Sequence, residues 1–254
     1  MEKLEVLYKK EKGAVKPTQG YEDDFAFDMY ASEGRLVPPL TFRSVAVPTN
    51  LKTAFDPIEA GMFISLRSGC ASKTPLIVSN SPGIVEGTYR DGIGILLRNT
   101  FIDNSLVDFV ITTKGERLPI SKVPKKVLQE ARRFYDAETE LLGYAEPTSK
   151  EAKAVNEAAY RTLVPRGTIY IAKHDRVAQM SFIPKIVAEF KETGVLPDSV
   201  RQENGFGSSG TTLSTPRIET LVENFEEKED ERKKREEKLK KALEVSNKVR
   251  KKPQ

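Results

Sequence analysis

The 254-residue sequence is poor in cysteine and histidine, and it has no long apolar run. Its single cysteine, Cys70, excludes an internal disulfide and a zinc site built from several cysteines. A membrane-spanning helix needs a run of about 18 apolar residues, and none occurs. The opening residues, MEKLEVLYKKEKGAVK, also lack the apolar core of a secretory signal. We therefore expect a soluble, cytoplasmic protein without a membrane partner.

Net positive charge is scarce outside the C-terminal tail. The net charge is +4, yet residues 223–254 alone hold 12 Lys or Arg and 9 Asp or Glu. The rest of the chain is therefore almost neutral, which argues against nucleic acid as a partner. We expect residues 213–254 to form a charged helix or a disordered tail.

Short apolar or alternating runs fill the first hundred residues, and Pro, Gly, Asn and Asp separate them. Many short strands with frequent turns predict a sandwich, a barrel or a jelly roll. The runs are KLEVLY, RLVPPL, FRSVAVPT, MFISLRS, LIVSNS and GIGILLRN, and β character returns later with GTIYIA and RVAQMSFIPKIVAEF.

A helical pattern interrupts this β body between residues 105 and 165. Residues 123–142 repeat their apolar positions with a period near 3.6, and Pro124 and Gly143 suit the start and end of a helix. A second helix follows, with Thr148 or Ser149 as its N-cap. We therefore predict a mostly helical insertion within a mainly β domain.

Five stretches join predicted strands to polar or glycine-rich residues. They are AFDMYA (26–31), LRSGCASK (66–73), NSPGIVEGTYRDGIGI (80–95), DRVAQMSFIP (175–184) and RQENGFGSSG (201–210). Each is a weak signal alone, since LRSGCASK could be an ordinary polar turn. Together they supply what phosphate binding uses, namely arginine forks, hydroxyls and free backbone N–H groups. The arginines concerned are Arg67, Arg176 and Arg201.

Aromatic and acidic side chains in the same stretches suit the rest of a nucleotide site. Phe206, between glycines, could stack on a base, and Tyr89 could pack on a sugar. Asp28 and Glu86 offer carboxylates for activating water or supporting a metal ion.

In this order, the five stretches resemble the five motifs of the trimeric deoxyuridine triphosphate nucleotidohydrolases (dUTPases), and in particular phage members with an insertion between the third and fourth motifs. The resemblance implies a jelly-roll β-barrel formed by residues 1–104 and 166–212, with the fifth motif as an arm. It also implies a homotrimer that shares each active site among three subunits, inside a cell such as a phage-infected host. The implied reaction is hydrolysis of dUTP to dUMP and pyrophosphate, by water attack on the α-phosphorus with Mg²⁺.

The resemblance also assigns roles to individual residues. Glu86 would be the general base, and Asp28 would support catalysis and the metal ion through water. The residues implied to bind substrate are Arg67, Ser68 and Gly69 on the triphosphate, Asn80, Gly83 and Tyr89 in a hairpin around deoxyuridine, Gln179 near the phosphates, Arg201 on the terminal phosphate, Phe206 over uracil, and Gly207, Ser208 and Ser209 beside it. Tyr89 would exclude a 2′-hydroxyl. Cys70 would be a small buried apolar residue, and His174 would form a hydrogen bond or lie at the surface.

One residue departs from the family pattern. The third motif normally contains the run G-[VI]-[IV]-D, whereas this chain reads GIVE, with Glu86 in place of the Asp. The Glu86 carboxylate lies one methylene, about 1.5 Å, further out, and displacements near 1 Å can cost about 10²-fold in rate. An alternative is therefore a nucleotide-binding regulatory protein with weakened catalysis, which holds a protein partner through the insertion. A dCTP deaminase is a third reading, but Leu96 and Leu97 stand where its catalytic Glu would be expected.

Overall fold

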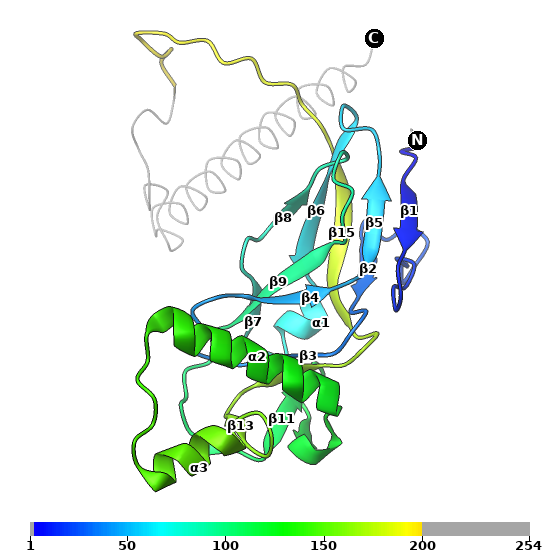
Figure 1. Ribbon diagram of the computed structural model, residues 1–254. Coiled ribbons are helices and arrows are strands. Elements are labelled where there is room, and N and C mark those ends of the chain that lie inside the picture. The colour runs from blue at the N-terminus through cyan, green and yellow to red at the C-terminus, as the bar shows by residue number, and fades with distance from the viewer. Residues whose placement is uncertain (1–2, 200–254) are drawn as a thin grey trace, which may run out of the picture. The chain divides into compact units, whose positions relative to one another are not determined.

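The computed structural model describes residues 3–199, and these residues form mainly short strands with one helical region (Figure 1). The elements are, in order, β1 (Leu7–Lys10), β2 (Phe27–Tyr30), β3 (Arg35–Val37), β4 (Val45–Pro48), β5 (Leu51–Ala54), β6 (Ala60–Leu66), α1 (Ser68–Ala71), β7 (Leu76–Val78), β8 (Gly83–Val85), β9 (Gly94–Asn99), β10 (Leu106–Val107), β11 (Phe109–Thr112), β12 (Arg117–Pro119), the 3-10 turn η1 (Ile120–Lys122), α2 (Lys125–Leu142), α3 (Lys150–Ala158), β13 (Val164–Pro165), β14 (Ile169–Ile171) and β15 (Arg176–Pro184).

Three larger sheets surround one apolar core. Their strand orders are β2-β15-β6-β8, β4-β9-β7 and β12-β11-β14-β3, with two-stranded pairs β1-β5 and β10-β13 beside them. Alternation along β9 places Ile95, Leu97 and Asn99 inside and Leu96 outside. The buried Asn99 amide donates to Val37 O at 3.0 Å and to Gly167 O at 2.9 Å, so it ties β9 to two other segments. The predicted mainly β, jelly-roll body is confirmed.

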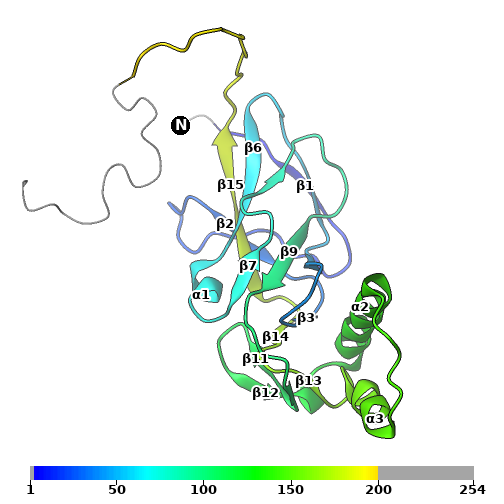
Figure 2. The same cartoon turned by 90° about the vertical axis from the view of Figure 1, so that its left-hand side faces the viewer.

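Strand β15 runs through the middle of the sheet that positions four of the five motifs. It pairs antiparallel with β2 on one side and with β6 on the other, which sets Gln179 opposite both Asp28 and Ser65 (Figure 2). Residues far apart in sequence therefore meet at one end of this sheet. The strand ends at Pro184, opposite Ala60 at the start of β6. The predicted continuation of the strand through Phe190 is wrong, because β6 offers no further partner.

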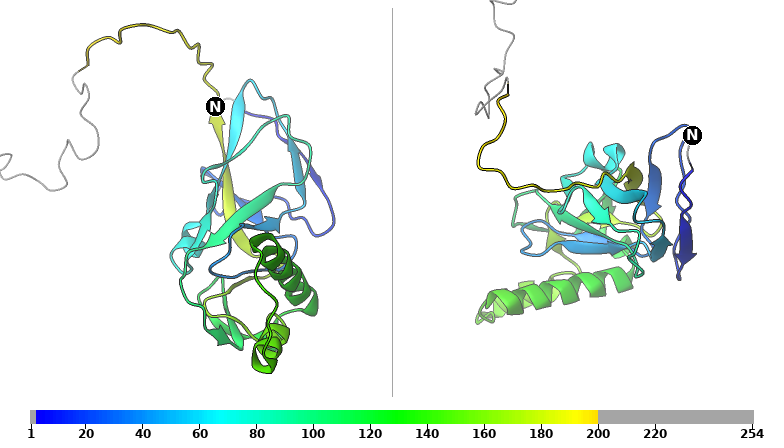
Figure 3. Two further views of the ribbon diagram at one scale, coloured as in Figure 1. Left: turned by 60° about the vertical axis from the view of Figure 1, so that its left-hand side comes forward. Right: turned by 90° about the horizontal axis from the view of Figure 1, so that it is seen from above.

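The segment 105–165 adds strands as well as helices. Strand β11 pairs parallel with β14 and antiparallel with β12, so the segment extends a sheet of the body. Helix α2 packs alongside β3, and α3 lies beyond it at the same end of the body (Figures 1 and 3). A second apolar cluster joins the segment to β3 and β14; its buried members are Leu36, Val107, Val110, Ile120, Val123, Val127, Ala131, Ala159, Tyr160, Val164 and Tyr170.

Both predicted helices are confirmed, together with their end signals. Helix α2 follows Pro124 and ends at Gly143, which has the left-handed φ of 66° that favours glycine. The Ser149 hydroxyl accepts a hydrogen bond from Ala152 N, as an N-cap does. Among residues 3–199, no helix is long and apolar enough to cross a membrane.

The chain divides into two compact units, with the boundary between Ala188 and Glu189. The first unit carries every helix and strand named above. The described part of the second unit, residues 189–199, contains no helix or strand. The predicted tail, residues 213–254, lies outside the described residues.

Candidate functional site

A buried carboxylate holds two arginines at the end of the central sheet. Asp28, on β2, is only 7% exposed. Its Oδ1 lies 2.5 Å from Arg67 Nε, and its Oδ2 lies 3.1 Å from Arg176 Nη1. Because both carboxylate oxygens are engaged, the two guanidinium groups are fixed beside each other. Both arginine side chains remain partly exposed, at 30% and 51%, so they can meet an anion from solvent.

The stretch LRSGCASK forms a helical turn rather than an irregular loop. Arg67 is extended at the N-cap, and α1 follows directly. Cys70 is buried in the main core and anchors the turn, while Ser68 and Gly69 are exposed. Within the described residues, the backbone N–H groups of Ser68 and Gly69 donate to no carbonyl. Next to an arginine, such free N–H groups suit an anion.

A pocket of about 610 Å³ opens beside this cluster, and its walls include Asp28, Arg67, Arg176 and Gln179. The turn at residues 20–26 also lines this pocket, through Gly20, Tyr21, Asp24, Phe25 and Ala26. Asp24 holds that turn, since its Oδ2 accepts from Gly20 N at 3.0 Å and from Tyr21 N at 2.9 Å. No sequence motif predicted this turn, and none predicted that Arg176 shares Asp28 with Arg67.

Glu86 and Tyr89 lie together in a second pocket. This pocket, of about 520 Å³, is lined by Ile84, Val85, Glu86, Thr88, Tyr89, Ile93 and Gly94. A backbone hydrogen bond from Tyr89 N to Glu86 O, 3.0 Å long, closes the turn between the two side chains. Both side chains are exposed, so the carboxylate and the aromatic ring are open to a ligand. The pocket therefore offers a carboxylate and an aromatic ring to one ligand.

The third motif is a loop between sheets rather than a paired hairpin. Strand β8 pairs with β6, whereas β9 pairs with β4 and β7. The hairpin implied by the resemblance is therefore wrong for these residues. Asn80 and Gly83 lie at the other end of β8 from Glu86, after a cis bond between Ser81 and Pro82.

Gly87 sets the position of Glu86. A Cβ at this residue would lie 2.4 Å from Phe55 O, so no larger residue fits without moving the loop. We expect Gly87→Ala to displace the Glu86 carboxylate and to lower kcat by about 10²-fold. The matched control is Gly92→Ala, since a Cβ there meets no atom within 4 Å. Steady-state kinetics of both variants test this, and equal rates for Gly87→Ala and the unchanged protein would contradict it.

The two pockets lie at opposite ends of β6. Arg67 directly follows this strand, whereas Val85, next to Glu86, pairs with Met62 near its start. At about 3.3 Å per residue, Glu86 and Arg67 are separated by roughly 20 Å along the strand. The described chain therefore brings Asp28, Arg67 and Gln179 together, and separately Glu86 and Tyr89, but does not join the two groups.

The remaining predicted residues divide into described and undescribed ones. The His174 ring nitrogen Nε2 lies 3.2 Å from Gly13 O, so the predicted hydrogen-bonding role is confirmed. Cys70 is buried as predicted, and burial raises the pKa of its thiol. The fifth-motif residues Arg201, Phe206, Gly207, Ser208 and Ser209 lie outside the described residues 3–199.

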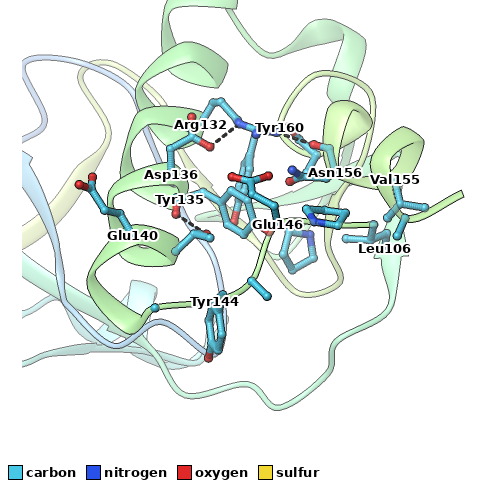
Figure 4. A pocket seen from close by; sticks show the side chains of 17 residues that line it. Leu106, Arg132, Tyr135, Asp136, Glu140, Tyr144, Glu146, Val155, Asn156 and Tyr160 are labelled. Atoms are coloured by element: carbon cyan, nitrogen blue, oxygen red, sulfur yellow. Dashed lines mark hydrogen bonds and ion pairs between the residues drawn. The ribbon is translucent and has the colours of Figure 1, made fainter. Parts of the chain in front are cut away.

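A third pocket, of about 780 Å³, lies in the insertion between α2 and α3 (Figure 4). Arg132 lines this pocket and links the two helices. Its Nε lies 2.8 Å from Asp136 Oδ1 on α2, and its Nη1 donates to Asn156 O on α3. The rings of Tyr135 and Tyr160 lie 5.5 Å apart, and burial raises the pKa of Tyr160. This pocket shares no residue with the other two.

Comparisons with known proteins agree with the observed fold. No family model matches the chain. The chain is 30% identical over 132 residues to the deoxyuridine 5′-triphosphate nucleotidohydrolase of Clostridium tetani. This alignment covers 46% of this chain and 81% of that protein. The chain is 26% identical over 207 residues to the protein of the same name from Tropheryma whipplei (strain Twist), which covers 82% and 94%.

Solved structures show the same fold. The Staphylococcus bacteriophage 80alpha dUTPase with dUPNHPP aligns with a TM-score of 0.60 and 22% identity over 82% of this chain and 99% of its own. The dUTPase from phage phi11 of S. aureus aligns at 0.53 and 17% over 76% and 97%. The fold is thus that of a phage dUTPase. Together with the Clostridium tetani relative, this places the chain in a family of nucleotide hydrolases: it belongs to the deoxyuridine 5′-triphosphate nucleotidohydrolase family.

Proposed function

We propose that the protein hydrolyses dUTP to dUMP and pyrophosphate. The observation that carries this is the pairing of Glu86 with Tyr89 in one pocket, in a member of the dUTPase family whose other pocket holds two arginines on Asp28. A carboxylate beside a ring-binding pocket and a cluster of guanidinium groups are the parts that nucleotide hydrolysis needs.

Glu86 acts on the water in this scheme. Its carboxylate takes a proton as the water oxygen bonds to the α-phosphorus, and the bond from that phosphorus to the bridging oxygen breaks. Pyrophosphate leaves with the electron pair of that bond. Arg67, with the free N–H groups of Ser68 and Gly69, balances the negative charge of the phosphate chain.

The other predicted contacts complete the substrate site. Gln179 lies beside the phosphate pocket, with its Nε2 3.3 Å from Ser65 Oγ, and Asn80 and Gly83 lead into β8. Deoxyuridine would pack against Tyr89. The fifth-motif residues would close over the ligand; this stays a prediction, as does their role as a lid.

Magnesium fits this site as an ion carried by the substrate rather than by a protein cage. Both oxygens of Asp28 are engaged by arginines, and residues 3–199 contain no group of three or more His, Cys, Asp or Glu placed to hold a metal. Mg²⁺ commonly keeps several waters and binds substrate phosphates with only one or two carboxylates. Asp28 would therefore contact it through water. When bound, the ion neutralises charge that develops on the phosphates.

The separation of the two pockets supports a homotrimer with shared sites. Glu86 and Tyr89 of one copy would meet Arg67 of another, since they lie at opposite ends of β6 in one chain. The outer faces of β7 and β9 also expose Ile77 (45%) and Leu96 (38%), apolar surface that a neighbouring copy would cover.

The regulatory alternative, weakened catalysis with a protein partner on the insertion, is not favoured. Glu86 keeps a carboxylate in an open pocket beside Tyr89, as an active enzyme would. A protein partner for the insertion stays a prediction. Exposed apolar side chains near its pocket, Leu141, Tyr144 and Val155, are where such a contact would form.

Substrate specificity tests the proposed function directly. Because Tyr89 would pack where a 2′-hydroxyl must fit, we expect dUTP to be hydrolysed about 10²-fold more efficiently than UTP, the usual discrimination against one added hydroxyl. We expect Tyr89→Ala to narrow this ratio. Pyrophosphate release from dUTP, UTP, dTTP and dCTP measures the specificity. Comparable kcat/KM values for dUTP and UTP would show that Tyr89 does not exclude the 2′-hydroxyl.

A further inference from the structure

Helix α2 presents one buried carboxylate to the β body. Glu138 is 8% exposed, and it is the charged residue among those that α2 buries, beside Val127 and Ala131. Burial of a carboxylate is costly unless donors satisfy it. Its oxygens accept from Arg43 N at 2.6 Å and from Phe42 N at 3.2 Å. The insertion thus holds the segment before β4 by its backbone.

Helix α2 makes a second contact with the segment before β4, through the Arg43 side chain. The Arg43 guanidinium lies over the Phe134 ring, 5.4 Å from its centroid, and its Nε lies 3.6 Å from Glu138 Oε1. Phe134 and Glu138 are four residues apart, so they lie on one face of α2. The helix therefore fixes both the backbone and a side chain of this segment.

The held segment has an unfavourable backbone of its own. Leu40 has φ of +58°, a left-handed conformation that a residue with a side chain rarely adopts. Leu40 and Phe42 are also 59% and 62% exposed, so little core packing supports them. Contacts from outside the segment must therefore keep it in place.

On its other side, this segment contacts the residue just before the third motif, and it also contacts Arg98 on β9. Ser44 Oγ lies 2.6 Å from Ser79 Oγ, and Arg98 Nη2 donates to Phe42 O at 2.9 Å. Ser79 is the residue before Asn80, and its N–H donates to Leu96 O. Contacts therefore run without a gap from α2 to the residue next to Asn80.

We propose that Glu138 is a positioning residue for nucleotide binding: through the segment 41–44 and the Ser44–Ser79 hydrogen bond, it sets the place of Asn80. This rests on the proposed function, because it takes Asn80 as a substrate contact. Glu86 lies at the far end of β8, so the effect falls on affinity and leaves the hydrolysis step largely intact. The insertion thereby acts on the site through a fixed contact in the fold.

Glu138→Gln and Ser79→Ala test this against Glu140→Gln, an exposed neighbour on the same helix. We expect each of the first two to weaken binding of a non-hydrolysable dUTP analogue about 3- to 10-fold, the usual effect of one hydrogen bond, with little change in kcat. Glu140→Gln should bind normally. Because both changes act along one line of contacts, their effects should not add. The double variant should bind the analogue as tightly as the single variant with the lower affinity.

Two outcomes would overturn the proposal: normal affinity in Glu138→Gln, or full additivity in the double variant. Amide hydrogen exchange gives a reading that needs no substrate, and it uses Ser79→Ala should Glu138→Gln fold poorly. Glu138→Gln should speed exchange at residues 79–85, and Glu140→Gln should not. Faster exchange in a protein that neither binds nor hydrolyses dUTP would keep the positioning contact and reject the proposed function. Unchanged exchange in a protein that hydrolyses dUTP normally would reject the positioning contact and keep the proposed function.

Discussion

Glu86→Gln is expected to lower kcat for dUTP by about 10²- to 10⁴-fold, the contribution of a general base, while affinity for a non-hydrolysable analogue stays nearly unchanged. The amide keeps the size of the side chain in the pocket it shares with Tyr89, but it cannot take the proton of the attacking water. Pre-steady-state turnover and analogue binding, measured on one preparation, separate the two effects.

The matched control for this change is Glu86→Asp. It restores the shorter carboxylate of the family pattern, so its rate should equal or exceed that of the unchanged protein. Undiminished turnover in Glu86→Gln would exclude Glu86 as the base, and another carboxylate would then have to be found.

Arg67→Lys is expected to lower kcat/KM for dUTP by about 10²- to 10³-fold, as loss of one charge-stabilising donor does. The Arg67 Nε is bound to Asp28, and the rest of its planar fork faces the phosphate pocket. A lysine ammonium has no planar fork, so it cannot reproduce the geometry in which Nε meets Asp28 while the terminal nitrogens meet a phosphate. Its single charge keeps a cation beside Asp28 Oδ1, while Arg176 stays on Oδ2.

The loss in Arg67→Lys should depend on the length of the phosphate chain. Binding of dUTP should weaken far more than binding of dUMP, because the pocket beside Arg67 would hold the triphosphate. Isothermal titration with both nucleotides distinguishes this from a general loss of folding. Equal weakening of both would place Arg67 away from the phosphates.

Local signals were enough to predict the helices and many of the strands. Pro124 and Gly143 bound α2, and the Ser149 N-cap precedes α3, because capping depends only on neighbouring residues. The end of β15 was not predicted. Apolar residues continue after Pro184, but the partner strand β6 begins at Ala60 and pairs no further. Strand pairing over long separations, as between β11 and β14, leaves no local pattern.

The site was predictable as a set of residue types and not as a geometry. The order of the motifs indicated Asp28, Arg67 and Gln179, but only the pairing of β15 with β2 and β6 shows that they meet. Glu138 carried no signal, since a glutamate in an amphipathic helix normally faces solvent. Its partners lie 95 and 96 residues earlier in the chain.

The proposed active site combines Glu86 of one copy with Arg67 of another. Co-expression of Glu86→Gln and Arg67→Lys chains, carrying different tags, tests it most directly. In randomly mixed oligomers about a quarter of the sites would pair an intact Glu86 with an intact Arg67, so about a quarter of the normal dUTP turnover should return. Oligomers with both tags that remain as inactive as either parent would show that the site lies within one chain and would contradict the claim.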